Sequence, residues 1–263
     1  MLRLGTRIVT LDASRRIAMG AGAKVYSYEK LLLATGGSPR HLRGSDPSVI
    51  YFHKLADFRK AWWLATLGAE FAVVGGGFIG SEIAAALAKN KKKVSMIFPN
   101  ASIGEKVYPR PLANFLNVYF RNHGVNVRFS ERVLRIGRRG DKLIVHTDGN
   151  DDITVDAVVA GIGIEPNVDL AKFAGLKVSD GIIVSERLCT NNPHIFAAGD
   201  VANFPVALDR RLRCEHEDNA RAMGRVAGRN MAGASQAYRH LPFFYSALFA
   251  QTTRQSSNRS AHR

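Results

Sequence analysis

The stretch Phe71-Ala72-Val73-Val74-Gly75-Gly76-Gly77-Phe78-Ile79-Gly80 decides the fold of this chain. Its four apolar residues predict a short buried strand, and glycines in the spacing GxGxxG follow at once. Ile79, Ile83 and Leu87 then recur at helical spacing, and residues 94–98 form a second apolar stretch. The sequence therefore predicts a strand, a glycine turn, a helix and a second strand, which together form a βαβ unit.

The three glycines of the spacing have separate roles in such a unit. Gly75 permits the tight turn, Gly77 lets the backbone approach a pyrophosphate, and Gly80 lets the helix pack closely on the strand. The alternative is that these glycines form a tight turn with no ligand. The position of the glycines, directly between a strand and a helix, disfavours that alternative. The acidic residue expected at the ribose, about 20 positions on, is replaced by Phe98-Pro99-Asn100. The sequence predicts a nicotinamide-dinucleotide site and leaves NAD and NADP open.

Further elements extend the βαβ unit into an α/β sheet. An apolar stripe predicts a second helix, with Gly124 as its C-cap and a strand at 125–129; the stripe is Leu112, Phe115, Leu116, Tyr119 and Phe120. Strands joined through helices are parallel. From residue 133 to residue 155, apolar and polar residues alternate on both sides of the turn Asp148-Gly149-Asn150. This pattern predicts a β-meander.

The remaining segments are predicted more coarsely. Residues 3–35 read as hairpins followed by a buried strand, and residues 55–67 have helical apolar spacing. Further strands are expected near 157–161, 175–184 and 195–198. A helix is expected from Asp218 to Met231, and residues 251–263 read as a disordered tail.

Composition excludes several classes of protein. The 263 residues are 46% hydrophobic and 22% charged, which is globular, and the net charge is +15. The basic residues are spread in small groups, without a recognition helix, so nucleic-acid binding is disfavoured. Cys189 and Cys214 form no CxxC pair and no zinc spacing, which favours a reduced compartment. No stretch of about 18 uncharged apolar residues predicts a membrane-spanning helix.

Two segments on either side of the βαβ unit resemble a known superfamily. They are Tyr28 to Arg40, which contains Ala34-Thr35-Gly36-Gly37, and Ile195-Phe196-Ala197-Ala198-Gly199-Asp200. Both resemble motifs of the pyridine nucleotide-disulfide oxidoreductase superfamily, whose members have two dinucleotide-binding domains. Three further motifs, at 78–82, 160–167 and 214–220, resemble its apoptosis-inducing-factor-like branch. The resemblance covers about Val25 to Leu248.

The resemblance implies two cofactors, FAD and NAD(P)H, and assigns residues to each. On the FAD side it implies Thr35, Gly36, Arg40, Gly199, Asp200, Glu215, His216 and Tyr245. On the NAD(P)H side it adds Phe78, Glu82 and Gly163 to Gly75, Gly77 and Gly80. The N-terminus of the helix near Asp218 would point at the flavin, where negative charge accumulates on reduction. No catalytic side chain and no metal ligand is implied.

The resemblance to this superfamily also implies that the FAD domain is incomplete. No glycine motif for the FAD adenosine diphosphate precedes Gly75, so we expect a fragment of a longer flavoprotein. The predicted fold is α/β and Rossmann-like, a three-layer parallel sheet plus a β-meander. The predicted domains are 1–50, the end of the first half of the FAD domain; 51–170, the NAD(P)H domain; 171–234, the second half of the FAD domain; and 235–263, a C-terminal stub and tail.

The predicted function is an FAD-dependent NAD(P)H oxidoreductase that passes hydride to flavin N5 and then electrons to an acceptor. A small redox protein and a quinone are the two candidate acceptors, and a homodimer is a candidate assembly. The alternative is a non-catalytic nucleotide-binding remnant without stable FAD. The predicted compartment is the cytoplasm, with the mitochondrion as the alternative in a eukaryote. The basic segment Met1 to Arg16 is similar in composition to a mitochondrial presequence, but its apolar residues fit short strands better.

Overall fold

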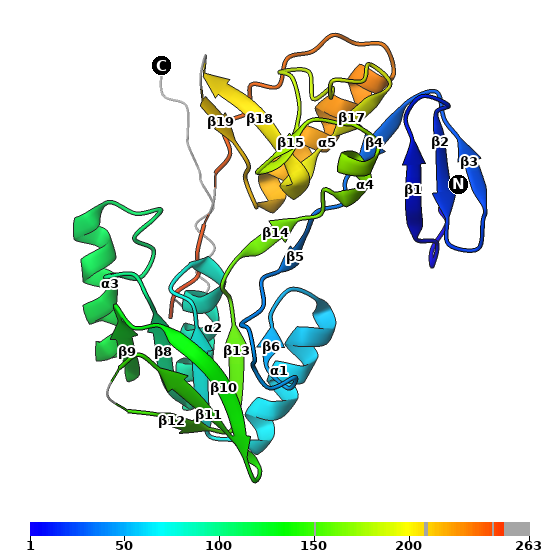
Figure 1. Ribbon diagram of the computed structural model, residues 1–263. Helices are drawn as coiled ribbons and strands as arrows, with labels where there is room; N and C mark the ends of the chain where they lie inside the picture. The colour runs from blue at the N-terminus through cyan, green and yellow to red at the C-terminus, as the bar shows by residue number, and fades with distance from the viewer. Residues whose placement is uncertain (150, 208–209, 244, 250–263) are drawn as a thin grey trace, which may run out of the picture. The chain divides into compact units, whose positions relative to one another are not determined.

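A computed structural model of the chain describes residues 1–149, 151–207, 210–243 and 245–249 (Figure 1). The chain divides into two compact units. Unit 1 contains Met1–Ser38 and Ile164–Phe244, and unit 2 contains Pro39–Gly163 and the described residues from Tyr245 onward. Each unit has its own apolar core, so each is described by itself.

Unit 2 is built on a five-stranded parallel sheet. Its strand order is β6 (Ile50–Tyr51), β13 (Ala157–Ala160), β7 (Glu70–Val74), β8 (Lys93–Phe98) and β9 (Val125–Phe129). Helix α2 (Phe78–Lys89) connects β7 to β8, and α3 (Arg110–Asn122) connects β8 to β9. The predicted βαβαβ order is therefore confirmed.

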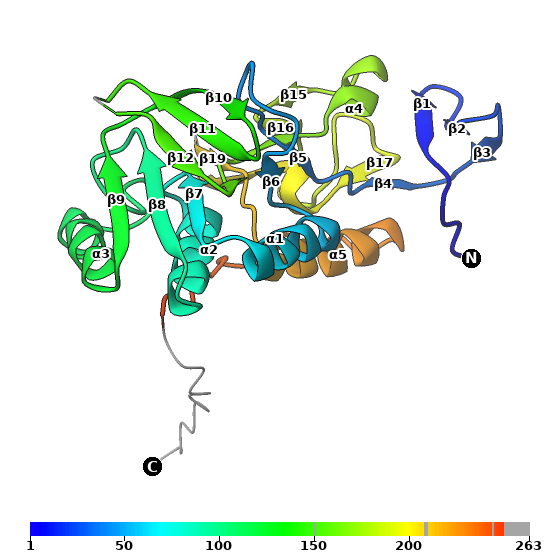
Figure 2. The ribbon, with the colours of Figure 1, turned by 90° about the horizontal axis from the view of Figure 1, so that it is seen from below.

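The strands of this sheet are buried on both faces. Phe71 and Val73 of β7 pack with residues of α2 and α3, whereas Ala72 and Val74 pack with the meander β10 (Val133–Arg139), β11 (Lys142–Thr147) and β12 (Ile153–Val155). Figure 2 shows the helices on one side of β7 to β9 and the meander on the other. Burial on both faces explains why β7 is apolar throughout and does not alternate. The predicted three-layer sheet plus meander is confirmed, and the meander itself is the third layer.

The predicted apolar stripe of α3 is partly wrong. Leu112 and Phe115 are 44% and 57% exposed, and the buried face consists of Ala113, Leu116, Asn117 and Phe120. The face is rotated because Asn117 is turned inward to hold the loop before the helix. Its Oδ1 accepts the N–H of Ile103 at 3.0 Å, and its Nδ2 donates to the Ala101 carbonyl at 2.8 Å. Gly124, at φ 80°, follows the helix as predicted.

Unit 1 combines small sheets with one long helix. The strands β1 (Ile8–Asp12), β2 (Ile17–Gly20) and β3 (Val25–Ser27) form an antiparallel sheet, and β4 (Leu31–Leu33) pairs in parallel with β17 (Ile195–Ala197). A four-stranded sheet contains β15 (Val178–Ser179), β16 (Gly181–Ile183), β18 (Ala202–Ala207) and β19 (Arg210–Leu212). Helix α5 (Glu217–Met231) packs in the core of this unit. The β18–β19 hairpin was not predicted.

The remaining elements are one helix of unit 2, α1, and four short elements. They are β5 (Gly37–Pro39), α1 (Leu55–Leu67), β14 (Ile164–Pro166), α4 (Asp169–Phe173) and the 3-10 turn η1 (Gly199–Val201). The predicted tail at 251–263 lies outside the described residues. Within the described part of the chain, no helix has the length and apolar character needed to cross a membrane.

Asp156 ties the beginning of β7 to the meander. Its carboxylate accepts the N–H groups of Ala69 and Glu70 at 2.8 and 2.9 Å and forms an ion pair with Lys142. The Lys142 ammonium, followed by the two backbone donors, lowers the pKa of Asp156 below its ordinary value. The ionised carboxylate therefore stabilises the folded state.

We expect Asp156→Asn to lower the free energy of unfolding at pH 7 by about 0.5 to 1.5 kcal/mol, because the exposed N–H of Ala69 and the half-buried N–H of Glu70 lose a charged acceptor. Since the pKa is lowered in the folded state, this contribution is complete above the unfolded pKa of about 3.9 and is lost as pH falls through the folded pKa. Urea unfolding of variant and parent at pH 7 and pH 3 measures the difference. The matched control is Asp141→Asn at an exposed position of the same hairpin; an equal loss at both pH values would contradict the prediction.

Candidate functional site

The glycine turn after β7 is a place of very close backbone packing. Gly75 adopts φ 119°, and a Cβ added to it would lie 2.2 Å from the Gly161 carbonyl oxygen. A Cβ added to Gly80 would lie 2.0 Å from the Gly75 carbonyl oxygen. Neither position has room for a side chain. The ends of β7 and β13 and the beginning of α2 therefore meet at the van der Waals limit of their backbones.

Gly77 differs from the two packed glycines. It is the N-cap of α2, with φ −86°, and a Cβ added to it would meet no heavy atom within 4 Å. This glycine leaves open space in front of the helix N-terminus, where N–H groups lack intrahelical acceptors and the dipole favours an anion. The geometry fits a dinucleotide pyrophosphate at this place.

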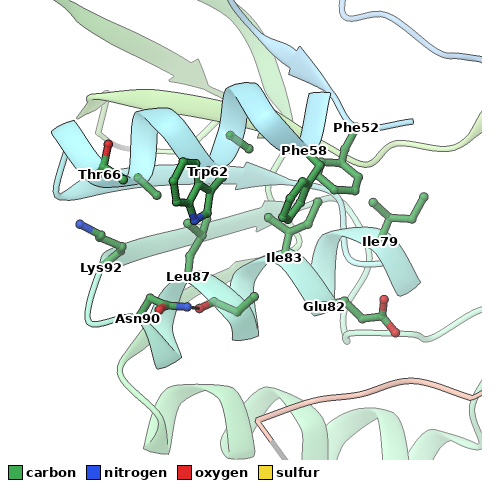
Figure 3. Close-up of a pocket in the computed structure, with 13 residues that line it drawn as sticks. Phe52, Phe58, Trp62, Thr66, Ile79, Glu82, Ile83, Leu87, Asn90 and Lys92 are labelled. Carbon is green, nitrogen blue, oxygen red and sulfur yellow. Dashed lines mark hydrogen bonds between the residues drawn. The ribbon is translucent and has the colours of Figure 1, made fainter. Parts of the chain in front are cut away.

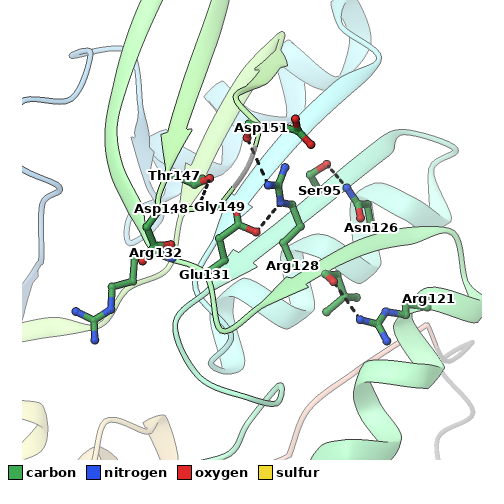
Figure 4. A network of polar contacts seen from close by, with 11 residues as sticks. Ser95, Arg121, Asn126, Arg128, Glu131, Arg132, Thr147, Asp148, Gly149 and Asp151 are labelled. Atoms are coloured by element: carbon green, nitrogen blue, oxygen red, sulfur yellow. Dashed lines mark hydrogen bonds and ion pairs between the residues drawn. The ribbon is translucent and has the colours of Figure 1, made fainter.

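The end of β8 lies against the loop after β9. The N–H of Ser130 donates to the Asn100 carbonyl at 2.8 Å, and the N–H of Glu131 donates to the Phe98 carbonyl at 3.0 Å. The loop thus brings an acid to the end of β8, but Glu131 forms a 2.6 Å ion pair with Arg128 (Figure 4). The ion pair uses Oε2 of Glu131, whereas its Oε1 is buried and has no hydrogen-bond partner among the described residues.

Glu82 on α2 is held by the C-terminal segment of unit 2. The Ser246 hydroxyl donates to its Oε1 at 2.9 Å, and the Ala247 N–H lies 3.3 Å from the same oxygen. Phe249 then stacks on His123 at the end of α3, with ring centroids 4.2 Å apart. Sequence reasoning singled out Glu82 but missed Ser246, because 164 positions separate the two residues.

The other predicted residues of unit 2 lie at element ends. Gly163 follows β13 at φ 92°, with no atom within 4 Å of an added Cβ, and its carbonyl accepts the N–H of Arg40 at 3.0 Å. Phe78 begins α2, and its ring meets Tyr108 edge to face at 5.9 Å. Tyr245 is 71% exposed.

In unit 1 the two superfamily-like segments come together. Strands β4 and β17 are parallel, with Leu33 paired to Ala197, so the residues after both strands lie at the same edge. Thr35 follows one strand and Asp200 the other. Cofactors bind at the carboxyl ends of parallel strands in this class of fold. The structure thus juxtaposes segments that are about 160 positions apart in the chain.

Asn167 fixes the segment after β4. The Thr35 hydroxyl donates to the Asn167 carbonyl, and the Asn167 amide donates to the Thr35 carbonyl, both at 2.8 Å. Gly36 and Gly199 adopt left-handed conformations with φ 61° and 77°. These turns place backbone groups at the strand ends.

The N-terminus of α5 is capped by His216. Its Nδ1 accepts the N–H of Asp218 at 3.1 Å. Arg213, which sequence reasoning missed, connects the surrounding groups. Its side chain is only 9% exposed, forms a 2.7 Å ion pair with Glu215 and donates to the Asp200 carbonyl at 3.3 Å. Arg213 holds two of the predicted flavin-side residues in place.

A buried pair anchors the first turn of α5. Asn219 is fully buried. Its Oδ1 accepts a hydrogen bond from the Tyr238 hydroxyl at 2.8 Å, and its Nδ2 donates to the Cys214 carbonyl at 3.1 Å. Burial raises the pKa of Tyr238, which keeps the hydroxyl neutral and able to donate. Neither residue was predicted, although Asn219 lies within the 214–220 motif.

The two cysteines do not form a redox site. Cys189 and Cys214 are both free, and burial raises the pKa of each thiol, which disfavours a reactive thiolate. The described residues contain no group of three or more His, Cys, Asp or Glu side chains arranged to hold a metal ion.

A Rossmann-type unit and a second strand-edge site in one chain are the features of the two-dinucleotide-binding-domain class of fold. The model of the pyridine nucleotide-disulphide oxidoreductase family matches residues 1–224, and the chain belongs to that family. Members of the family are FAD-dependent and use NADH or NADPH. The predicted family and fold class are confirmed.

Similar proteins include ferredoxin reductases and an apoptosis-inducing factor. The ferredoxin–NAD(+) reductase component of the anthranilate 1,2-dioxygenase system of Burkholderia cepacia is 36% identical, over 93% of this chain and 61% of its own length. Mitochondrial apoptosis-inducing factor 1 of Dictyostelium discoideum is 30% identical, over 92% of this chain and 48% of its own.

A solved structure shows the same arrangement of elements. The ferredoxin reductase for the CYP199A2 system of Rhodopseudomonas palustris matches with a TM-score of 0.89 at 28% identity, over 94% of this chain and 62% of that chain. The present chain thus spans between 48% and 62% of the length of these three proteins.

The glycine geometry predicts opposite outcomes for two alanine substitutions. Gly80→Ala should lower the free energy of unfolding by about 1 to 3 kcal/mol or more, because Cβ would overlap a backbone oxygen that cannot move aside alone. Gly77→Ala should leave it within about 0.5 kcal/mol of the parent, since the Cβ enters open space. Urea unfolding compares both variants, and similar losses would show that the described packing is wrong.

Proposed function

We propose that this chain is part of an FAD-dependent NAD(P)H oxidoreductase. The observation that carries the proposal is the open space at Gly77, in front of the N-terminus of α2, beside the tightly packed Gly75 and Gly80. Such a turn would hold the dinucleotide pyrophosphate by backbone N–H groups. When bound, FAD would supply a flavin ring able to accept a hydride at N5 from NAD(P)H and to release its two electrons one at a time to a one-electron acceptor.

The flavin side of the proposal rests on unit 1. The carboxyl ends of β4 and β17 would receive FAD, with Thr35 and Gly36 on one segment and the Asp200 carboxylate accepting ribityl hydroxyl groups from the other. The N-terminus of α5 carries positive dipole charge, which would stabilise the negative charge of a reduced flavin. Arg213 would hold Asp200 and Glu215 in position beside the flavin.

On the nicotinamide side, Glu82 would orient the ring rather than act on a proton. Its Oε1 is already held by Ser246, which supports a fixed carboxylate. Arg40, Gly163, His216 and Tyr245 remain proposed cofactor neighbours. No side chain is required as an acid or a base, because hydride transfer itself moves no separate proton.

The proposed acceptor is a small iron–sulfur or similar redox protein. The relative from Burkholderia cepacia is named a ferredoxin–NAD(+) reductase component, which supports this class over a quinone. The net charge of +15 also favours an acidic protein partner in the first encounter.

A second candidate function is a nucleotide-binding protein without flavin. It is favoured by the glycine turn itself, because Gly75, Gly77 and Gly80 all belong to unit 2 and need no residue of unit 1 to form it. In that case unit 2 would bind NAD(P)H and no electrons would be transferred.

One titration separates the two candidates. The purified chain is mixed with FAD, gel-filtered and scanned near 450 nm, and NADH is then added without oxygen. The oxidoreductase predicts bound flavin whose absorption is bleached by NADH. Absence of bound flavin, with NADH binding retained, would overturn the oxidoreductase in this chain and support the second candidate.

Gly77→Ala should weaken NADH binding by about 10-fold to 100-fold, because the added methyl group keeps the pyrophosphate from the charge-assisted N–H contacts. NADH fluorescence enhancement measures the dissociation constant. The matched control is Gly224→Ala in α5, where an added Cβ also meets nothing within 4 Å. Unchanged binding in the Gly77 variant would place the pyrophosphate elsewhere.

A further inference from the structure

Residues 246–249 connect α2 and α3 within unit 2. At one end of this segment, the Ser246 hydroxyl and the Ala247 N–H both approach Oε1 of Glu82 on α2, at 2.9 and 3.3 Å. At the other end, the ring of Phe249 packs against the end of α3. The segment therefore links a carboxylate of the proposed nicotinamide side to a helix that has no proposed contact with a ligand.

The carboxylate of Glu82 is turned toward this segment rather than toward α1. Figure 3 shows the side chain of Glu82 at one end of the groove between α1 and α2, with its oxygen atoms directed away from Phe58 and Trp62. Oε1 has the two donors of the segment, whereas Oε2 accepts no hydrogen bond from the residues that the structure describes. One oxygen of the carboxylate is thus held, and the other is left for a ligand.

Phe249 is held by three aromatic rings at the end of α3. Its ring stacks on that of His123 with centroids 4.2 Å apart. It also meets the rings of Tyr119 and Phe120 edge to face, at 5.6 and 5.0 Å. Because Phe120 is fully buried, these contacts join Phe249 to the apolar core of unit 2. Aromatic pairs in such geometries add to the stability that area burial alone provides.

The backbone of Phe249 shows that tertiary contacts fix this segment. Phe249 adopts φ 54°, which is in the left-handed region. A residue with a β-carbon keeps this conformation only where the surrounding structure imposes it. Leu248 also packs against the core that contains Phe120. The path of residues 246–249 is therefore set by packing on α3 and not by a local turn preference.

The hydrogen bonds to Glu82 depend on such an anchor. Ser246 is half-buried and Ala247 is exposed, so water competes with both donors. On a loose segment, the entropy cost of ordering the backbone would offset most of the gain from these bonds. With Phe249 packed on α3, the segment is already ordered when a ligand arrives, and Glu82 keeps one orientation.

The position of Glu82 suits a contact with the nicotinamide end of a dinucleotide. Gly77 is the N-cap of α2, and Glu82 lies in the second turn of the same helix. A carboxylate oxygen accepts hydrogen bonds only, and the carboxamide of nicotinamide offers two N–H donors. A fixed Oε2 can therefore select one orientation of the carboxamide while the helix N-terminus holds the pyrophosphate.

We propose that Phe249 is a positioning residue for the nicotinamide group. Its packing on α3 holds the two preceding donors against Oε1 of Glu82, and this leaves Oε2 directed at the carboxamide of the ligand. The inference rests on the proposed function, because it needs a dinucleotide at the glycine turn. It has a specific consequence: Phe249 affects the nicotinamide end of the ligand and leaves the pyrophosphate end unaffected.

Two ligands that share one end and differ at the other test this consequence. The full chain as purified is titrated in a calorimeter with NAD⁺ or NADP⁺, whichever binds more tightly, because neither reduces a flavin. It is titrated separately with the matching ADP-ribose, which keeps the pyrophosphate and lacks nicotinamide. The ratio of the two dissociation constants measures the contribution of the nicotinamide group alone.

Phe249→Ser and Ser246→Ala should each weaken binding of the dinucleotide by about threefold to tenfold, because Glu82 loses a fixed hydrogen bond. Binding of ADP-ribose should stay within about twofold of the parent, since its contacts are independent of the segment. Phe249→Tyr keeps the ring and should bind both ligands like the parent. The matched control is Phe115→Ser, which removes an exposed ring that stacks on Tyr119 from the other side of α3.

A second background shows whether Phe249 acts through Glu82. In Glu82→Ala there is no carboxylate to position, so adding Phe249→Ser should change the dissociation constant of the dinucleotide by less than about twofold. A parent chain that binds neither ligand would overturn the proposed function itself. If the parent binds both, an equal loss for both ligands, no loss for either, or a full loss in the Glu82→Ala background would overturn the role of Phe249 alone.

Discussion

The structure of unit 2 depends on backbone contact among three glycines. Gly75 touches Gly161 at the end of β13, and Gly80 of α2 touches Gly75, at separations that exclude a β-carbon. These contacts bring two strand ends and one helix N-terminus to a common point. Gly77 lies between them and faces open space instead. Tight packing on one side of the turn thus leaves open space at the helix N-terminus on the other side. The stability of the fold and the proposed ligand site therefore depend on the same turn.

The sequence predicts this part of the fold well because local pattern and tertiary packing agree there. The apolar run at β7, the glycine spacing and the helical period of α2 each specify the same βαβ unit. Agreement fails in α3, where the polar residue Asn117 replaces an apolar residue on the buried face to satisfy a loop. An apolar stripe identifies a helix, but side-chain hydrogen bonds can rotate its buried face by one residue.

The candidate site is less predictable because its supporting contacts are long-range. Motif resemblance singles out Thr35, Asp200 and Glu82 as separate residues. It does not identify Arg213, which orders the segment after β17, or Ser246, which holds a carboxylate on α2. Such partners are ordinary polar residues in the sequence, and only folding brings them into hydrogen-bond range. Motifs can therefore predict the residues expected to contact a ligand. They do not predict the residues, such as Arg213 and Ser246, that hold those residues in position.

The same limit applies to the outer face of unit 2. The spacing of Leu55, Phe58 and Trp62 predicts an amphipathic helix, and such a helix is expected to bury its apolar face in its own domain. Helix α1 leaves that face open above α2. Periodicity predicts which residues share a face of a helix, whereas how much of that face becomes buried depends on what the fold places beside it, and for α1 that leaves no residue buried.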